Sequence, residues 1–187
     1  GHILGQEDVA WEPHHDVVAS EDEVVIYELV LGDVNGDPTT VLERAHEHLK
    51  DNRLTPRGFS SQHVVYDTTA IVGAAFSDPN FNLNSEGEEG TGGDAVTYLL
   101  PSGWEEEPTL TIECTVWYQS MPPKWMAPML QIQGDSLING FRELYAEFVP
   151  TPERIATVTF TESIIGVTEA PPFTLSAYPN PSRGEGV

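Results

Sequence analysis

Runs of apolar and alternating residues predict that this chain is built mainly from β-strands. Residues 24–32 begin VVIYELVL, apolar on both faces apart from Glu28, which is typical of a strand buried between two layers. Residues 63–76 are rich in β-branched and small apolar residues, and a further strand is expected at 95–100. Residues 109–118 alternate cleanly between polar and apolar positions, and 155–166 supply a last strand. We expect these strands to pair antiparallel.

A turn follows the first of these strands. Asn35-Gly36 is a strong signal for a tight hairpin turn. The next residues, 39–50, fit two structures, because Leu42, Ala45 and Leu49 have helical spacing whereas Thr39-Thr40-Val41 favours a strand. We favour a strand that returns beside the first.

One segment, 136–148, predicts an amphipathic helix. Asp135 or Ser136 can cap its start, and Pro150 stops it. Its apolar stripe consists of Leu137, Ile138, Phe141, Leu144, Tyr145 and Phe148. Several strands, frequent turns and one helix predict a mostly β fold, an antiparallel β-sandwich of Ig-like or jelly-roll-like form with one inserted helix.

The segment between two of the predicted strands, 77–94, is rich in Gly, Asn and acidic residues, which predicts a long surface loop. Its acidic part, 86–94, fits a solvated loop better than a metal site. Residues 168–173 have the composition of a linker.

The charge of the chain restricts its partners. Thirty Asp and Glu face eight Lys and Arg among 187 residues, which gives a net charge of -22. Nucleic acid and anionic membrane surfaces would be repelled. No apolar run is long enough to span a bilayer. Such a surface fits a protein from a salty environment and an ordinary acidic exported protein equally well.

The single cysteine, Cys114, excludes an intrachain disulfide. It shares a strand face with Leu110, Ile112 and Val116, so we expect a buried, inert thiol.

Asp33, Asn35 and Asp37 alternate as the first ligands of a calcium loop do. Pro38 and Arg44 stand where such a loop needs glycine and a closing glutamate. A hairpin turn is therefore the favoured interpretation, with calcium held by Asp33 and Asp37 together with other loops as the alternative.

Two pairs of histidines could hold a metal or a haem iron. His46 and His48 would share one face of a strand, but no third ligand is evident. His14 and His15 are adjacent, so they point to opposite sides, and either could in principle be an axial ligand to a haem in a neighbouring domain.

The run Lys50-Asp51-Asn52-Arg53 places charge and amide groups between Leu49 and Leu54. Polar runs in apolar surroundings commonly fix a loop by buried hydrogen bonds. We therefore predict a structural role for Asp51, Asn52 and Arg53, with Asp51 or Arg53 substantially buried. The alternative is contact with a ligand.

No nucleophile elbow, zinc-protease helix, phosphate-binding loop or dinucleotide fingerprint is present in the sequence. We therefore expect no catalytic residues and no enzyme activity in this chain.

The end of the chain carries a specific motif. Residues 174–182 read TLSAYPNPS, followed by a Gly-containing turn at Ser182-Arg183-Gly184. This stretch resembles the opening of the C-terminal sorting domain of type IX secretion. The resemblance implies export to the cell surface or beyond, contact with the secretion machinery, and a sorting domain that begins at 174–187 and continues past Val187.

Dispersed motifs over the first 165 residues or so resemble a second family. They are Ile26-Tyr27-Glu28, the Gly32–Gly36 turn, Thr39-Thr40, KDNRL at 50–54 with PRGF at 56–59, DAVTY at 94–98 and VWYQ at 116–119. Together they are similar to the non-haem C-terminal domain of secreted multihaem c-type cytochrome proteins. The resemblance implies a haem-bearing region upstream and a domain, here 1–167, that begins before this chain does. This chain has no CxxCH motif and binds no haem covalently.

Two functions follow as expectations. The first is an accessory, non-catalytic β domain of an exported multihaem electron-transfer protein, which packs against the haem domain of its own parent chain or against a redox partner. The alternative is a calcium- or carbohydrate-binding module of an exported enzyme, with Trp104, Trp117 or Trp125 as stacking platforms.

Overall fold

The computed structural model describes residues 11–64, 70–100, 109–148, 150–163 and 173–177. It is rich in β-strands, which form three small sheets, and two α-helices lie within the described residues. A closed sandwich is not shown. The chain divides into two compact units: residues 10–100 and 171–187 form unit 1, and residues 101–170 belong to unit 2.

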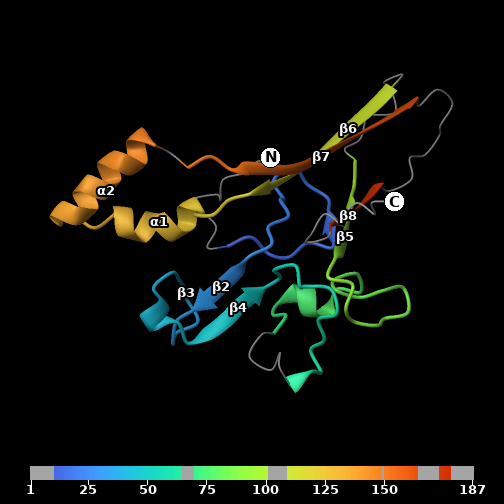
Figure 1. Cartoon of the computed structure of the whole chain (residues 1–187), viewed down its shortest axis with the longest axis horizontal. Coiled ribbons are helices and arrows are strands. Elements are labelled where there is room, and N and C mark those ends of the chain that lie inside the picture. The colour runs from blue at the N-terminus through green and yellow to red at the C-terminus, as the bar shows by residue number, and fades with distance from the viewer. Residues whose placement is uncertain (1–10, 65–69, 101–108, 149, 164–172, 178–187) are drawn as a thin grey trace, which may run out of the picture. The chain divides into compact units, whose positions relative to one another are not determined.

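Unit 1 contains two three-stranded sheets (Figure 1). In one sheet, β5 (Asp94–Tyr98) pairs antiparallel with β8 (Phe173–Ala177) and parallel with β1 (Val17–Val18). The expectation that all strands pair antiparallel is therefore wrong for β1 and β5. Every residue of β8 is paired with a residue of β5. The domain boundaries placed around residues 168–174 stay a prediction.

The second sheet holds the predicted hairpin. β2 (Leu29–Gly32) pairs antiparallel with β3 (Pro38–Thr39) and with β4 (Glu47–Asp51). A short 3-10 helix, η1 (Leu42–Arg44), separates β3 from β4. The returning strand expected in 39–50 is confirmed, and the helical spacing there reflects only this single turn.

One predicted strand is absent from the described residues of its range, of which 65–69 lie outside the described part, and another is shorter than expected. Among the described residues of 63–76 only Val72 makes a β-bridge, with Asp51, and a 3-10 helix, η3 (Ala74–Ser77), follows. Gly73 has a φ of 84°, which ends any extended run there. Residues 24–28 lie outside β2, because side chains rather than a partner strand take up part of their backbone hydrogen bonds, as described below.

Unit 2 contains a long two-stranded ribbon and two helices (Figure 1). β6 (Thr109–Tyr118) and β7 (Glu153–Ser163) pair antiparallel over almost their whole length. The predicted helix is present as α2 (Ser136–Glu147), and the Asp135 carboxylate accepts hydrogen bonds from the backbone N–H groups of Leu137 and Ile138. The sequence did not predict α1 (Pro123–Leu130), in which Pro123 occupies the first turn.

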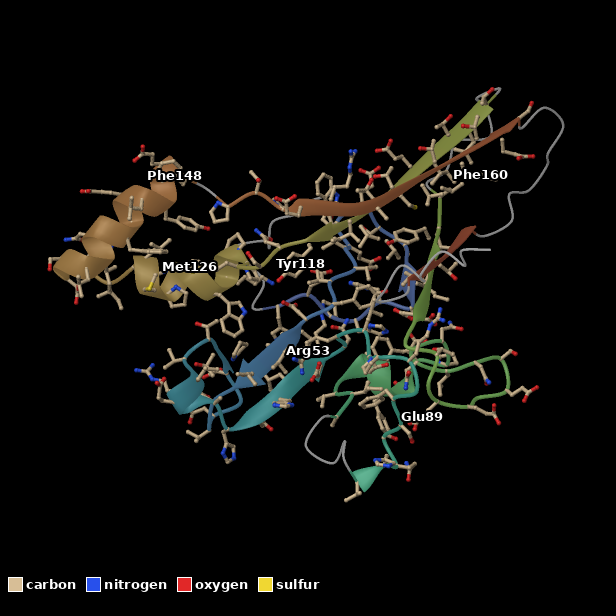
Figure 2. All side chains as sticks on the ribbon, viewed as in Figure 1. Arg53, Glu89, Tyr118, Met126, Phe148 and Phe160 are labelled. Carbon is tan, nitrogen blue, oxygen red and sulfur yellow. The ribbon has the colours of Figure 1, made fainter. Side chains whose placement is uncertain are left out.

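Burial differs greatly along the chain. The buried apolar side chains of the described residues are Val18, Leu31, Phe59, Ala75, Phe81, Val96 and Met126, and all but Met126 belong to unit 1. Figure 2 shows the side chains on both units, with Met126 on α1 and Phe160 on β7 labelled. Neither α-helix within the described residues has the length and apolar character that crossing a bilayer requires.

Candidate functional site

The interior of unit 1 contains a cluster of polar side chains centred on His14. Its Nε2 lies 2.7 Å from Oδ2 of Asp78, and its Nδ1 lies 3.1 Å from Nδ2 of Asn52. Phe81 packs edge-on against the imidazole, with ring centroids 5.4 Å apart. His14, Asp78 and Asn52 are all buried. The chain around His14 is therefore well packed, although it lies close to the N-terminal end of the described residues.

The hydrogen bonds of Asn52 fix the tautomer of His14. Asn52 Oδ1 accepts the backbone N–H of Glu28 at 2.8 Å, and Nδ2 donates to the Ile26 carbonyl at 3.0 Å. The amide therefore has one orientation, in which Nδ2 also donates to His14. His14 Nδ1 must accept this bond and carries no proton, so Nε2–H donates to Asp78.

Asp94, at the start of β5, extends the cluster. Its Oδ2 accepts a hydrogen bond from the Tyr27 hydroxyl at 2.8 Å. One ligating atom each of His14, Asp78 and Asp94 lie within 4.8 Å of one another. Two buried carboxylates are thus near neighbours.

The two carboxylates have pKa values displaced in opposite directions. Burial raises the pKa of Asp94, and the negative charge of Asp78 adds to the shift. Burial would also raise the pKa of Asp78, but hydrogen bonds from His14 and from the Asn80 backbone outweigh it and hold that pKa below its ordinary value. Burial, followed by the charge of Asp94, raises the pKa of the Tyr27 hydroxyl. Asp94 is therefore the carboxyl that takes up a proton first.

His14, Asp78 and Asp94 are the residue types of a divalent metal site, but their arrangement fits one poorly. A metal on Nε2 would move the imidazole proton to Nδ1, where it would face the donor group of Asn52. Two ligands of a tetrahedral metal also lie about 3.3 Å apart when each bond is about 2.0 Å. The 2.7 Å between His14 and Asp78 is the distance of a hydrogen bond.

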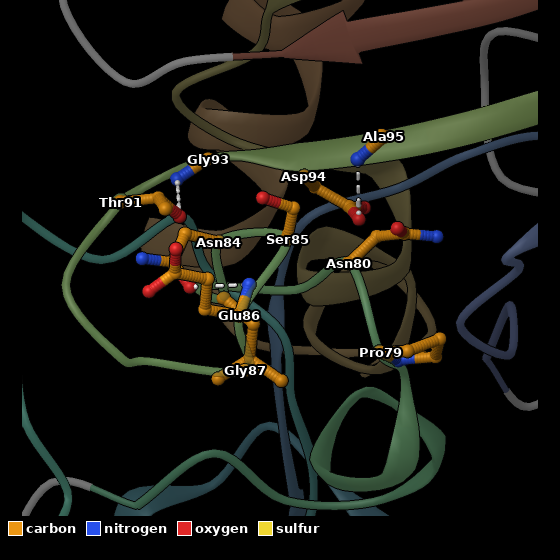
Figure 3. A pocket seen from close by; sticks show the side chains of 11 residues that line it. Pro79, Asn80, Asn84, Ser85, Glu86, Gly87, Thr91, Gly93, Asp94 and Ala95 are labelled. Atoms are coloured by element: carbon orange, nitrogen blue, oxygen red, sulfur yellow. Dashed lines mark hydrogen bonds between the residues drawn. The ribbon is translucent and has the colours of Figure 1, made fainter.

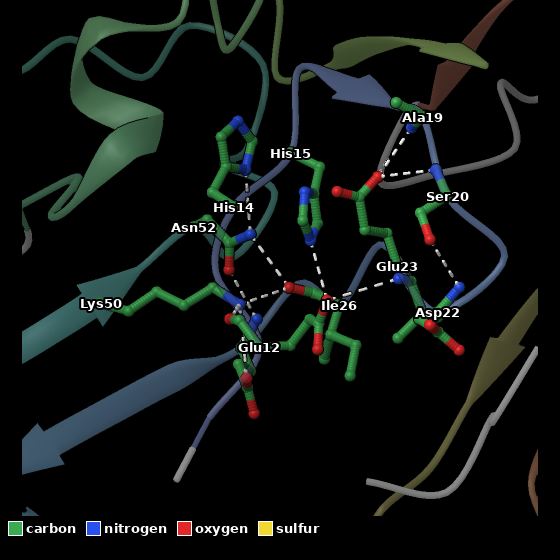
Figure 4. Close-up of polar contacts among 12 residues, drawn as sticks. Glu12, His14, His15, Ala19, Ser20, Asp22, Glu23, Ile26, Lys50 and Asn52 are labelled. Atoms are coloured by element: carbon green, nitrogen blue, oxygen red, sulfur yellow. Dashed lines mark hydrogen bonds and ion pairs between the residues drawn. The ribbon is translucent and has the colours of Figure 1, made fainter. Parts of the chain in front are cut away.

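Lys50 forms a second buried centre next to the first (Figure 4). Its Nζ donates to the carbonyl oxygens of Glu12 at 2.6 Å and Ile26 at 2.9 Å, and it lies 3.3 Å from a carboxylate oxygen of Glu28. Lys50 is only 1% exposed. Asn52 and Lys50, both at the end of β4, thus hold the segments around residues 12–14 and 26–28 in place.

The structure places the run predicted to be structural within this network. Asp51 is buried, as one of the two alternatives predicted, Asn52 is buried as well, and Arg53 is exposed. The guanidinium of Arg53 donates two hydrogen bonds, of 2.8 and 2.7 Å, to the Asp51 carboxylate. The predicted burial is confirmed for Asp51, and the structural role of the run stays a prediction.

The other predicted positions lie apart from the cluster. Asp33, Asn35 and Asp37 form the turn between β2 and β3, and Asp33 Oδ1 accepts the backbone N–H groups of Asn35 and Asp37. These hydrogen bonds lower the pKa of Asp33. The turn itself is confirmed, and calcium binding there stays a prediction.

The remaining histidine and tryptophan candidates also lie outside the cluster. His46 and His48 are exposed, and His15 bonds to Glu12 at 2.8 Å. Trp117 and Trp125 are 44% and 39% exposed in unit 2, and Trp104 lies outside the described residues.

A pocket borders the cluster, with Asp94 in its wall (Figure 3). Its volume is about 770 Å³, and eleven residues between Pro79 and Ala95 line it. One side of the pocket is built on Asn82, which is 1% exposed and has a positive φ of 59°. The Asn82 carboxamide oxygen accepts the Thr55 hydroxyl and the Gly92 N–H, which fixes the loop around it.

Sequence reasoning named His14 only as a possible haem ligand, and it assigned no site role to Asp78, Asp94, Tyr27 or Asn82. These residues are far apart in the chain, and no local pattern brings them together. The one local signal was the pair of histidines, of which one turns inward. Asn82, an asparagine in a Gly-rich loop, is among the residues that tolerate positive φ.

Compared with models of protein families, with curated proteins and with solved structures, the chain matches none of them.

Proposed function

We propose that this chain is an accessory, non-catalytic β domain of an exported multihaem c-type cytochrome protein, and that it docks through unit 2 onto the haem-bearing region. In this proposal haem belongs to the parent protein upstream, electron transfer takes place there, and the sorting motif directs export to the cell surface or the medium. The small sheets would then be parts of an Ig-like or jelly-roll-like sandwich.

The observation that carries the proposal is the apolar face of the β6–β7 ribbon. Across the ribbon Ile112 is paired with Phe160, Cys114 with Val158, and Val116 with Ala156. Val158 is 61% exposed and Val116 is 42% exposed. The opposite face carries threonine pairs, such as Thr115 with Thr157, whose hydroxyl oxygens lie 3.0 Å apart.

The apolar face of such a ribbon is expected to be buried by another surface. A two-stranded hairpin is marginally stable in water, and an apolar face on it gains free energy when another surface buries it. The partner must also tolerate a chain of net charge -22, which excludes an acidic surface. An apolar or basic surface of the haem-bearing region meets both conditions.

The buried groups of unit 1 support a structural role. Within the described residues every buried side-chain nitrogen or oxygen has a hydrogen-bond partner. The buried Lys50 and Asn52 are engaged with backbone groups of other segments. This is the arrangement of residues that hold loops in position.

The test mixes the purified chain with the separately produced haem-bearing region of its parent protein and measures binding by isothermal titration calorimetry. Val158→Asp, on the apolar face, should weaken binding at least tenfold, about 1.4 kcal/mol. Thr161→Asp is the matched control, because residue 161 lies on the threonine face opposite Thr111. No binding by the unaltered chain, or equal effects of the two variants, would overturn the proposal.

A further inference from the structure

The pocket beside Asp94 has the chemistry of a binding site. Its polar lining consists of Asn80, Asn84, Ser85, Glu86, Thr91 and Asp94. Figure 3 shows these residues around the pocket, with Asn84 and Glu86 near Thr91 and with Asn80 near Asp94. Its volume of about 770 Å³ lies in the range of small-molecule sites.

The loop that forms the pocket is fixed in advance. Asn84 Oδ1 accepts the backbone N–H groups of Glu86 and Glu88, both at 2.9 Å. Asn84 N–H and Gly87 N–H bond in turn to the carbonyl oxygens of Glu88 and Asn84. A loop held by its own hydrogen bonds loses little conformational freedom when a ligand binds.

Several polar groups of the wall have bonding capacity left. Within the described residues the Ser85 hydroxyl and the Glu86 carboxylate have no hydrogen-bond partner. The Thr91 hydroxyl accepts from Gly93 N–H and can still donate its own proton. Asn80 donates through Nδ2 to Asp16, which leaves its carbonyl oxygen able to accept. The pocket therefore offers donors and acceptors side by side.

Mixed donors and acceptors suit hydroxyl groups, each of which donates one hydrogen bond and accepts others. The carboxylates in the wall and the net charge of -22 disfavour an anionic ligand. A single cation is also disfavoured. Among the described residues Glu86 belongs to no group of three His, Cys, Asp or Glu ligands, and Asp94 belongs to one only with His14 and Asp78, which do not line the pocket. We propose that this pocket binds a small neutral carbohydrate, of monosaccharide or disaccharide size.

Asp94 forms part of the wall but has no free carboxylate oxygen, because Oδ2 accepts the Tyr27 hydroxyl and Oδ1 accepts the Ala95 N–H. The proposal differs from sugar stacking on Trp117 or Trp125, which lie in unit 2. It does not depend on docking of the ribbon face to a haem-bearing region.

The test is a titration of the ¹⁵N-labelled full chain with glucose, xylose, N-acetylglucosamine, maltose and cellobiose, each followed by amide NMR shifts in buffer containing EDTA. At least one sugar should shift the amides of Gly87, Gly92 and Gly93 saturably, with the indole N–H signals of Trp117 and Trp125 unmoved. Glu86→Ala and Ser85→Val should each weaken that binding about tenfold or more. Glu43→Ala, an exposed acid outside the pocket, should leave it unchanged.

Three outcomes would overturn the proposal. They are no saturable shift with any of these sugars, sugar-induced shifts confined to the tryptophan indoles, and pocket shifts that saturate with CaCl₂ alone but not with sugar. Folding of each variant is checked by the dispersion of the amide signals that lie outside residues 79–95. A failure here leaves the calorimetric test of ribbon docking unaffected, and the reverse also holds.

Discussion

Unit 1 and unit 2 both contain many apolar residues, but unit 1 buries several of them and unit 2 leaves most of them exposed. In unit 1 the side chains of Phe59, Phe81 and Val96 are almost fully buried, and polar groups such as Asn52 connect segments far apart in the chain. In unit 2 Leu137, Leu144 and Val158 are more than half exposed. Unit 1 therefore has a buried core within its described residues, whereas the described elements of unit 2 have regular secondary structure and little buried surface.

The largest effect on this difference between the units is expected from removing the Asn52 side chain in unit 1. Asn52→Ala would leave the Glu28 N–H and His14 Nδ1 without their partner in a buried setting, and the Ile26 carbonyl would keep only its bond from Lys50. Each unsatisfied buried group costs about 1–3 kcal/mol, so we expect a loss of about 3 kcal/mol or more in the free energy of unfolding. Urea denaturation measures it, with the exposed Asn35→Ala as control. A loss below about 0.5 kcal/mol would contradict the role of Asn52.

A smaller effect is expected at the neighbouring ion pair. Asp51→Ala removes a buried carboxylate that bonds to Arg53, and we expect a loss of about 2 kcal/mol. Arg53→Ala should cost less, about 1 kcal/mol, because the half-exposed guanidinium is partly screened by water. Thermal melts of the two variants and of the double variant give the coupling. Unchanged melting together with loss of partner binding would make this run a binding site instead.

The two buried carboxylates should respond to pH in opposite ways. The folded-state pKa of Asp94 is raised, so its stabilising contribution is full in acid and is lost as the pH rises through that pKa. The pKa of Asp78 is lowered, so its contribution is present above the ordinary value and is lost as the pH falls.

Asp94→Asn should therefore gain stability relative to the unaltered chain as the pH rises from acid to neutral. Asp78→Asn should lose stability over the same range. Denaturation curves at a series of pH values measure both differences. The same pH slope for the two variants would show that the opposite pKa shifts are wrong.

The smallest effect is expected in the ribbon. Cys114 shares the half-buried face of β6 with Leu110 and Ile112, whereas Val116 is exposed. Burial raises the pKa of the thiol, but the site is not a closed core. Cys114→Ser should therefore cost less than about 1 kcal/mol, the low end of the range for burying a hydroxyl. A loss above about 2 kcal/mol would indicate a ribbon face that is fully covered.

These predictions separate what the sequence determines locally from what it does not. The alternation over 109–118 and the capped stripe from Asp135 predicted β6 and α2 correctly, because both patterns are local. The same patterns did not predict burial, since no residue of α2 is buried despite its apolar stripe. The strand expected at 63–76 failed where Gly73 ends the extended backbone.

The candidate site was predictable only in part. The run 50–53 was recognised because polar residues stand out between two leucines. The contacts of Asn52 with His14, and of Tyr27 with Asp94, join residues 38 and 67 positions apart, and no local pattern encodes them. Residues 24–28 do not extend β2 because the side chains of Asn52 and Lys50 form hydrogen bonds with backbone groups of Ile26 and Glu28.

Amide hydrogen exchange on the free full chain, read residue by residue, tests the central claim most directly. Amides of β4, of β5 and of the residues bonded to Asn52 and Asn82 should exchange slowly. Amides of β6 and β7 should exchange much faster, because a ribbon with little buried surface opens locally at low cost in free energy. Adding the haem-bearing region should then slow exchange in β6 and β7 while leaving unit 1 unchanged. Equal protection of both units in the free chain would contradict the account.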